Sequence, residues 1–355
     1  MRIEEIDKNF AVKTFDNGEE KKVYKIPCKP FEMHGLYYDE KAQLFVRMDL
    51  DLANSISDKL GALVTNTAGG RIRFRTDAKI FTITVKYPRI SKHSIMTLAG
   101  RCGFTLVAKH GKREEIIGIL SPENDDQLVY TGSCEMYGEM KDYILYFPMY
   151  NAVSSVEIAL DKNAKVEQGS KYKDILPILY YGSSITQGAC ANLPVDAYES
   201  IISTWNDVDF INLGFSGNAL AEKEMVDYLK NIPCSLFVCD YDHNAPNVEH
   251  LEKTHYALYE NYRKANPNVP ILFITRPDYD KSPEKNQKRL QCIKATYRKA
   301  KRMGDDKVYF LSGKTLYGKD LERCYADLVH PNSLGHYKMA KGIYSAMKRI
   351  STEFI

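Results

Sequence analysis

Two separated segments of the 355-residue chain carry residue types that could perform nucleophilic chemistry together. Ser184 follows an apolar run, within the glycine-flanked segment GSSITQG at 182–188, so its hydroxyl and its backbone N–H can be exposed at one point. Near the C-terminus, Asp327 precedes His330 by three residues in one loop. An aspartate at that spacing can reach the imidazole and fix its tautomer, and the other ring nitrogen can then take a proton from a serine. These residue types could together perform acyl transfer as a Ser–His–Asp triad, although a simple Gly/Ser turn would also explain the segment at 182–188.

A second polar segment, GFSGN at 214–218, also follows an apolar run. It contains Ser216, which is a rival nucleophile, and Gly217, whose missing side chain lets a backbone N–H approach a ligand closely. Neither Ser184 nor Ser216 sits in the GxSxG elbow of α/β-hydrolases, because the last position of that motif is not glycine in either segment. On this observation alone, both serines stay candidates.

A third polar segment, DYDHNAP, begins at Asp240 directly after another apolar run. Polar side chains at the end of a buried strand are costly to leave unpaired, so the segment is either a hydrogen-bonded turn or a site. The amide of Asn244 can donate to an oxyanion. His243 could act as a base, although a hydrogen-bonded structural histidine is the more common explanation.

These polar segments follow a regular pattern that begins after residue 174. Five short apolar runs alternate with helical patterns, and this alternation predicts a parallel sheet covered by helices on both faces. Ligands bind such sheets beyond the carboxyl ends of the strands, which is where the three polar segments begin. The runs lie at 176–181, 209–213, 235–239, 271–275 and 308–311.

Helix signals between the later runs agree with this pattern. Apolar residues recur on one helical face over 248–265, and Pro267 must end that helix. The next helix is expected to begin at Pro283, with Ser282 as its cap, and to end before Gly304.

The first 160 residues have a different pattern. Short runs in which apolar and polar side chains nearly alternate, such as IFTITVKY at 80–87, are separated by turn-forming clusters. With no long helical pattern, these runs predict an all-β sandwich that is jelly-roll-like. The polar segment DKNAKVEQGSKYK at 161–173 is interpreted as a linker. The expected domains are therefore 1–165 and 174–355.

Four motifs, in order, resemble the conserved blocks of the SGNH, or GDSL, hydrolase family. The segment 182–186 resembles the GDSxT block, and Gly217 stands where the glycine of the second block falls. Asn244 stands where the asparagine of the third block falls, and Asp327 with His330 forms the DxxH block. The resemblance spans essentially the whole second domain.

The resemblance implies a flavodoxin-like three-layer α/β/α fold with a parallel sheet. It implies that Ser184 is the nucleophile, that His330 is the general base and that Asp327 orients this base. The backbone N–H groups of Ser184 and Gly217, with the side chain of Asn244, would form the oxyanion hole. The chemistry implied needs no metal and no organic cofactor.

Two positions depart from the family pattern. Ser183 replaces the usual aspartate before the nucleophile, and Ala245 replaces the aspartate often found after the asparagine. Both usual residues support the reacting groups rather than react. Asp240 and Asp242 are candidates to take over such supporting roles.

The order of domains is similar to that of carbohydrate acetyl esterases within this family, in which a β-sandwich precedes the hydrolase domain. We therefore expect a serine esterase that removes small acyl groups, above all acetyl, from acylated sugars or oligosaccharides. One alternative is a short-chain lipid esterase or thioesterase of the same family. Another is a catalytically inactive carbohydrate-binding protein.

Composition restricts the partners and the location. The formal net charge of +3, without a block of Lys and Arg, argues against a nucleic-acid partner. No apolar stretch approaches the run of about 18 residues that a membrane span needs. The eight cysteines form no CxxC pair and the N-terminus is charged, so free thiols and a cytoplasmic location are expected. A homo-oligomer is left open.

Overall fold

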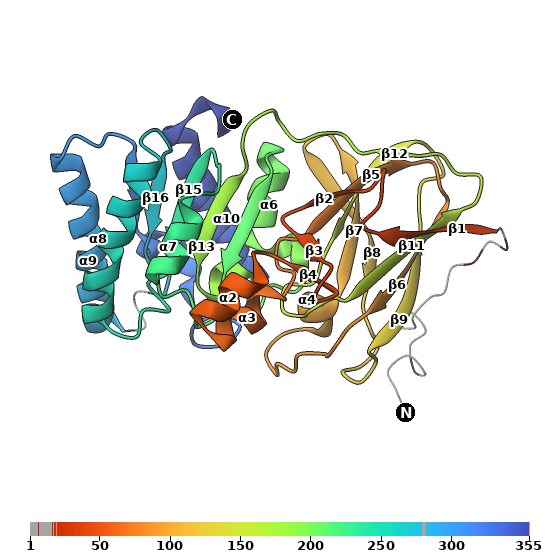
Figure 1. Cartoon of the computed structure of the whole chain (residues 1–355), viewed down its shortest axis with the longest axis horizontal. Coiled ribbons are helices and arrows are strands. Elements are labelled where there is room, and N and C mark those ends of the chain that lie inside the picture. Colours follow the sequence, from red (N-terminus) through yellow and green to blue (C-terminus); the bar gives the residue numbers. More distant parts are fainter. Residues whose placement is uncertain (1–5, 7–15, 17, 19, 279–281, 355) are drawn as a thin grey trace.

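A computed structural model describes residues 20–278 and 282–354, together with residues 6, 16 and 18. The first half of the chain forms a β-sandwich, and the second half forms a three-layer α/β/α unit beside it (Figure 1). The predicted fold class, an α/β/α hydrolase unit preceded by a β-sandwich, is therefore confirmed. The jelly-roll topology of the sandwich stays a prediction.

The sandwich consists of two antiparallel sheets. Side chains on alternate positions, such as Phe81 and Ile83 of one sheet and Ile72 and Phe74 of the other, share one buried core. One sheet contains, in spatial order, β1 (Lys21–Ile26), β11 (Ser155–Asp161), β6 (Ile80–Lys86) and β9 (Val129–Glu135). The other contains β12 (Val166–Gln168), β5 (Arg71–Thr76), β10 (Lys141–Tyr146), β7 (Phe104–His110) and β8 (Arg113–Leu120), with β2 (Glu32–His34) also on β5.

The predicted linker is wrong in part. Its residues Val166–Gln168 form β12, which pairs antiparallel with β5 and extends the larger sheet. The sandwich therefore continues past residue 165. This strand has only three residues, VEQ, and shows no alternation of apolar and polar side chains, so the sequence pattern did not predict it.

The first half of the chain also contains short helices that the strand pattern did not predict. Each begins at a side chain that accepts a hydrogen bond from the first helical turn: Asp49, Ser57 and Thr97. The helices are α2 (Leu50–Ile56), α3 (Asp58–Val64) and α4 (Leu98–Cys102). A two-stranded ribbon of β3 (Tyr37–Asp39) and β4 (Leu44–Val46) precedes them.

Helices α2 and α3 belong to the core of the α/β/α unit rather than to the core of the sandwich. Ala53, Leu60 and Val64 are fully buried in the same cluster as Leu213 and Phe215. Figure 1 shows these two helices against the α/β/α unit, next to α7. The two halves of the chain are therefore joined through a shared core.

The five predicted parallel strands are all present in one sheet. Their order is β14-β13-β15-β16-β17, in which the first strand of the chain, β13, lies between β14 and β15, and this is the flavodoxin-like order that was expected. In the register, Gly182 at the end of β13 lies beside Gly214 of β14 and Asp240 of β15. The strands are β14 (Phe210–Gly214), β13 (Ile178–Gly182), β15 (Leu236–Asp240), β16 (Ile271–Ile274) and β17 (Val308–Leu311).

Helices cover both faces of this sheet because its strands are apolar on both sides. Leu179 and Tyr181 pack with one set of helices, whereas Ile178 and Tyr180 pack with the other. The first set is α7 (Lys223–Leu229), α8 (Val248–Ala265) and α9 (Pro283–Arg302). The second is α6 (Tyr198–Asn206) and α10 (Ser333–Ile350).

One detail of the predicted helix starts is wrong. Ser282 occupies the N-cap position of α9 and Pro283 its first turn, but the Ser282 side chain makes no capping hydrogen bond. The end of the helix is as expected, because Gly304 adopts a positive φ of 89° just beyond it.

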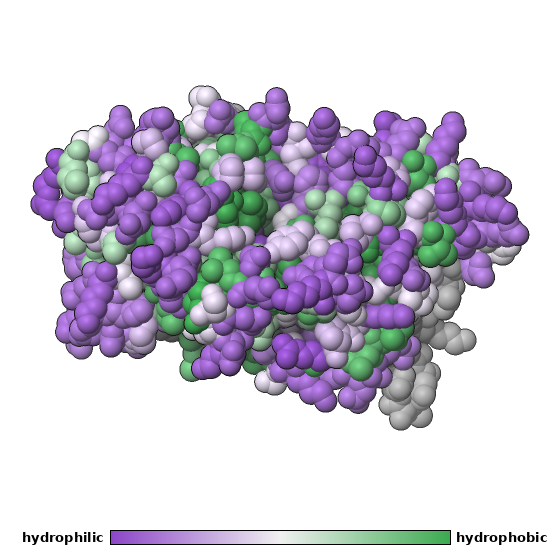
Figure 2. All heavy atoms as spheres, viewed as in Figure 1, coloured by the Kyte–Doolittle hydropathy of each residue, from purple (hydrophilic) through white to green (hydrophobic). Residues whose placement is uncertain are grey.

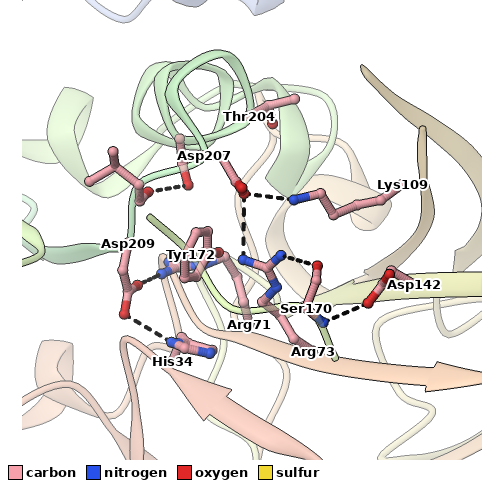
Figure 3. A network of polar contacts seen from close by, with 12 residues as sticks. His34, Arg71, Arg73, Lys109, Asp142, Ser170, Tyr172, Thr204, Asp207 and Asp209 are labelled. Carbon is pink, nitrogen blue, oxygen red and sulfur yellow. Dashed lines mark hydrogen bonds and ion pairs between the residues drawn. The ribbon is translucent and has the colours of Figure 1, made fainter. Parts of the chain in front are cut away.

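Ion pairs join the sandwich to the α/β/α unit in the turn just before β14 (Figure 3). Arg71 of β5 contacts the carboxylate of Asp209. Lys109 Nζ of β7 lies 2.6 Å from Asp207 Oδ1, and Arg73 Nη1 lies 3.6 Å from the same atom. Both arginine side chains are almost fully buried.

One face of the molecule is covered mainly by polar side chains. Figure 2 shows a mostly hydrophilic face on which hydrophobic residues gather in small groups. Among the described residues, no helix has the length and apolar composition required to cross a bilayer.

Candidate active site

Ser184, His330 and Asp327 form one hydrogen-bonded chain. Ser184 Oγ lies 2.8 Å from His330 Nε2, and His330 Nδ1 lies 2.8 Å from Asp327 Oδ2. An ionised carboxylate can only accept hydrogen bonds, so Nδ1 carries the hydrogen and Nε2 accepts from the serine hydroxyl. This arrangement places the imidazole where it can remove the proton of Ser184.

The loop before α10 fixes the aspartate of this chain. Asp327 Oδ1 accepts hydrogen bonds from the backbone N–H groups of Val329 and His330, at 2.7 and 2.6 Å. Partial burial raises the pKa of Asp327, but the hydrogen bonds from the His330 ring and from the two N–H groups outweigh it and hold this pKa below its ordinary value. The carboxylate is therefore ionised at neutral pH.

The position of Ser184 follows from the turn between β13 and the short helix α5 (Ser184–Gln187). Ser183 is the N-cap of α5, and its hydroxyl accepts a hydrogen bond of 3.2 Å from Ile185 N. The serine that departs from the family pattern thus caps the helix that begins with the nucleophile candidate. Ser184 itself is only 8% exposed, so little of this residue is open to solvent.

Two glycines allow this turn to pack tightly. A Cβ at Gly182 would lie 2.1 Å from Thr186 Oγ1 and 2.6 Å from the Asp240 carbonyl oxygen. A Cβ at Gly214 would lie 2.2 Å from Gln187 N. Neither position has room for a side chain, so α5 can lie directly against the ends of β13 and β14.

The predicted oxyanion-hole donors follow three adjacent strands. Ser184 follows β13, Gly217 follows β14 and Asn244 follows β15. In the part of the chain that the structure describes, the N–H groups of Ser184 and Gly217 donate to no protein acceptor. Asn244 Nδ2 donates to the Phe215 carbonyl oxygen at 2.6 Å, which uses one of its two hydrogens. Each group therefore keeps a hydrogen for a ligand.

Hydrogen bonds fix the backbone around Gly217, which has a φ of 69°. Phe215 N donates to the Gly182 carbonyl oxygen at 2.9 Å. Ser216 N donates to Gln187 Oε1 at 3.0 Å, and Gln187 Nε2 donates to the Met149 carbonyl oxygen of the sandwich half at 3.2 Å. Since Gln187 is fully buried, these bonds are shielded from water.

The predicted supporting residues are both buried: Asp240 is the last residue of β15, and Asp242 lies two residues beyond it. Burial and the neighbouring carboxyls of Asp242 and Glu199 raise the pKa of Asp240 well above its ordinary value. Asp242 Oδ2 accepts a hydrogen bond of 3.1 Å from Arg276 N, and burial raises its pKa also. Within the described residues, neither carboxyl contacts His330, so their support of the triad stays a prediction.

The two rival residues lie outside the hydrogen-bonded chain. His243 Nε2 lies 3.1 Å from Asp278 Oδ1, and Arg276 donates to the same carboxylate. Burial favours a neutral Asp278, but the Arg276 and His243 hydrogen bonds outweigh it and lower the pKa of this carboxyl. His243 therefore has a structural partner. Ser216 would need His330 Nε2 as its base, but this nitrogen is hydrogen-bonded to Ser184 instead.

Three residues that surround this site belong to no sequence motif. Arg47 donates to the Gly214 carbonyl oxygen at 2.7 Å, and Tyr150 Oη donates to the Ser184 carbonyl oxygen at 3.2 Å. The third is Gln187 of the glycine-flanked segment, whose side chain holds the backbone of Ser216 and Met149. Arg47 and Tyr150 come from the first half of the chain. All three side chains hydrogen-bond to backbone atoms, and because every residue has such atoms, these contacts produce no sequence motif.

No metal site accompanies this arrangement in the described residues. Groups of three or more His, Cys, Asp or Glu side chains in a metal-binding arrangement do not occur among them. The eight cysteines are free thiols, and each lies buried or half-buried.

Comparison with known proteins identifies the family. Residues 176–348 match the model of the GDSL-like lipase/acylhydrolase family, and residues 24–166 match the model of the N-terminus of SGNH-hydrolase-type esterases. The second half of the chain therefore belongs to the GDSL-like lipase/acylhydrolase family. This SGNH-type protein is a carboxylic ester hydrolase, as the motifs predicted. No curated protein matches it.

Solved structures share the fold of this GDSL-family protein over both halves. A protein described as a GDSL-like lipase from Bacteroides ovatus is 25% identical, with a TM-score of 0.83 over 93% of this chain and 98% of that one. The salicylyl-acyltransferase SsfX3 from a tetracycline biosynthetic pathway is 15% identical, with a TM-score of 0.74 over 93% and 97%. The acetyl xylan esterase Est2A from Butyrivibrio proteoclasticus is 13% identical, with a TM-score of 0.56 over 92% and 98%.

Proposed function

We propose that this protein is a serine esterase that removes small acyl groups, above all acetyl, from acylated sugars or oligosaccharides. The observation that carries the proposal is the chain from Ser184 through His330 to Asp327, with two contacts of 2.8 Å. Each residue in it has the hydrogen-bonding role that nucleophilic acyl transfer requires.

In the first step, His330 Nε2 takes the proton of Ser184 as Oγ forms a bond to the ester carbonyl carbon. The carbonyl oxygen becomes an oxyanion, and the N–H groups of Ser184 and Gly217 with the Asn244 amide stabilise it. The imidazolium next to Asp327 then gives its proton to the leaving alcohol, and the ester C–O bond breaks. An acyl group is left on Ser184.

In the second step, water replaces the alcohol. His330 removes a proton from the water, the hydroxide oxygen attacks the acyl carbon, and the same donors stabilise the second oxyanion. Collapse breaks the bond to Ser184 Oγ, which regains a proton from the imidazolium. The products are the free acid and the unmodified enzyme.

The sugar ester is favoured by the architecture. A β-sandwich directly before the hydrolase unit also occurs in the fold of the acetyl xylan esterase Est2A, which motivates an acetylated saccharide as substrate. The small exposed fraction of Ser184 fits a short acyl group. A short-chain lipid esterase or a thioesterase would use the same residues on a substrate with another leaving group. An inactive carbohydrate-binding protein, in contrast, would have no need of the hydrogen-bonded Ser184–His330 pair.

Hydrolysis of a substrate panel by the purified full chain tests the proposal. The panel contains an acetylated xylo-oligosaccharide, p-nitrophenyl acetate, p-nitrophenyl butyrate and an acetyl thioester, each with wild type and with Ser184→Ala. We expect the acetylated saccharide to have the highest kcat/KM and Ser184→Ala to abolish all turnover. Preference for butyrate or thioester would replace the substrate class, and equal rates for the two proteins would overturn the serine mechanism.

A further inference from the structure

Arg47 lies under the loop that carries Gly217, although it belongs to the first half of the chain. Its Nη1 donates to the carbonyl oxygens of Asn212 and Gly214, at 3.1 and 2.7 Å. Its Nη2 donates to the Leu63 carbonyl oxygen at 2.8 Å. Asn212 and Gly214 are the last alternate residues of β14, so the guanidinium holds the carboxyl end of the strand that leads into the oxyanion loop.

The charge of Arg47 is not neutralised by an acid. Among the residues that the structure describes, no carboxylate lies within 4 Å of its guanidinium, which contacts carbonyl oxygens instead. Arg47 is 4% exposed, and burial lowers its pKa to about 9, so it still carries a positive charge at neutral pH. A buried charge without a counter-ion is costly, and most buried arginines are paired.

The same guanidinium is close to the other parts of the site. Its Cζ lies 4.8 Å from the centre of the Phe215 ring, and Phe215 is two residues before Gly217. The carbonyl oxygen of Phe215 accepts the hydrogen bond from Asn244 Nδ2. Arg47 therefore contacts both the backbone and the side chain of the segment on which two of the three oxyanion donors depend.

We propose that Arg47 is a positioning residue of the oxyanion hole, which holds the end of β14 and the Gly217 loop in place and adds an unneutralised positive charge beneath them. This inference rests on the proposed serine-esterase function, because it assigns the charge to the oxyanion of that reaction. Negative charge grows on the substrate oxygen in the transition state, and a fixed positive charge in a dry region favours that change. Since Arg47 is buried and its guanidinium donates to carbonyl oxygens of the protein, we expect it to act on kcat rather than on substrate binding.

Three substitutions separate the charge from the packing. Arg47→Lys keeps a positive donor, Arg47→Gln keeps a neutral donor, and Arg47→Met keeps only the apolar stem. We expect kcat on p-nitrophenyl acetate to fall roughly tenfold to a hundredfold in Arg47→Gln and Arg47→Met, less than the loss of a direct oxyanion donor. Arg47→Lys is expected to regain most of this loss, and KM is expected to change by less than about threefold in all variants.

The Lys and Gln variants decide the outcome even if Arg47→Met does not fold. Equal kcat values for Arg47→Lys and Arg47→Gln, at equal folded fractions, would overturn the role of the charge, and so would a wild-type kcat in Arg47→Gln. Arg71→Gln at the other end of β14 is the matched control, for which we expect a lower melting temperature and unchanged kcat. Ser184→Ala measured in parallel separates failure of this inference from failure of the serine mechanism, because only the latter leaves Ser184→Ala active.

Discussion

The two ends of β14 are both held by buried arginines from the first half of the chain, but their charges have different surroundings. Before the strand begins, Arg71 lies against the carboxylate of Asp209 (Figure 3). Burial would lower the pKa of Arg71, but Tyr172 and Asp209 outweigh it and raise this pKa above its ordinary value. Where the strand ends, Arg47 has carbonyl oxygens as partners, and its pKa is lowered.

The difference suggests two roles: Arg71 joins two segments of the fold, whereas Arg47 supports the proposed reaction. A paired arginine fixes two segments to each other and leaves little net charge behind, which suits the end of the sheet away from the triad. An unpaired buried arginine lowers stability, and such costs are retained mainly where they serve a site. The comparison therefore predicts that substitutions at the start of β14 change stability, whereas substitutions around its end change kcat.

The largest effect is expected from His330→Ala. Without the imidazole, no group removes the Ser184 proton, so kcat on p-nitrophenyl acetate should fall roughly 10⁴- to 10⁶-fold. His330 is partly exposed, so thermal unfolding should change little. A variant that keeps more than a tenth of wild-type kcat would place the chemistry elsewhere and remove the basis of the comparison.

Asp327→Asn tests the orientation of the base. The amide can present an N–H to His330 Nδ1 and so favour the wrong tautomer, for which we expect a loss in kcat of about 10⁴-fold. The backbone bonds from Val329 and His330 can still be made to the remaining oxygen, so the loop should keep its form. Circular dichroism and kcat measured together check this, and a loss below tenfold would argue against the triad.

Asn244→Ala tests the segment that follows β14 through a residue other than Arg47. It removes one proposed oxyanion donor and also the hydrogen bond to the Phe215 carbonyl oxygen. We expect kcat to fall by about 10²–10³-fold with a small change in KM. An increase in KM with unchanged kcat would show that Asn244 binds substrate rather than stabilises the oxyanion.

Arg71→Met tests the paired end. The substitution leaves the partly buried Asp209 carboxylate without its arginine, and we expect a loss of about 2–4 kcal/mol in the free energy of unfolding, reduced because Asp209 is partly exposed. Urea unfolding measures this loss, and kcat per folded molecule should be unchanged. A tenfold loss of kcat would erase the distinction between the two ends.

The smallest effect concerns acid stability. Burial would raise the pKa of Asp209, but the hydrogen bond from His34 and the charge of Arg71 outweigh it and hold this pKa below its ordinary value. The unfolded state then binds more protons, so this carboxylate stabilises the fold above its ordinary pKa, and the stabilisation is lost as pH falls through the lower folded value. Asp209→Asn should therefore flatten the acid side of the unfolding free energy below about pH 4. An unchanged acid slope in this variant would contradict the shift.

The sequence was sufficient to single out the parts of the candidate site that local patterns encode. Ser184 and Asn244 follow buried strands, and Asp327 stands three residues before His330 in a single loop, so type and spacing were enough. The five parallel strands were found for the same reason, because each is a short apolar run between helices.

The remaining features depend on contacts between distant segments. Helices α2 and α3 have seven residues each, too few for a periodic pattern, and their fold comes from packing against the α/β/α core. Arg47 could not be found because its partners are backbone carbonyl oxygens of another part of the chain, and any sequence supplies such oxygens. The ion pairs of Arg71 and Lys109 likewise need the two halves to be placed first.

The central claim, that Ser184 is the nucleophile, is tested most directly by covalent labelling with a small organophosphate ester. Such a reagent phosphorylates an activated serine, and digestion with mass spectrometry locates the adduct. We expect loss of esterase activity in step with one label on Ser184, and no label in Ser184→Ala or His330→Ala. A label on Ser216, or an active enzyme that takes up no label, would contradict the account.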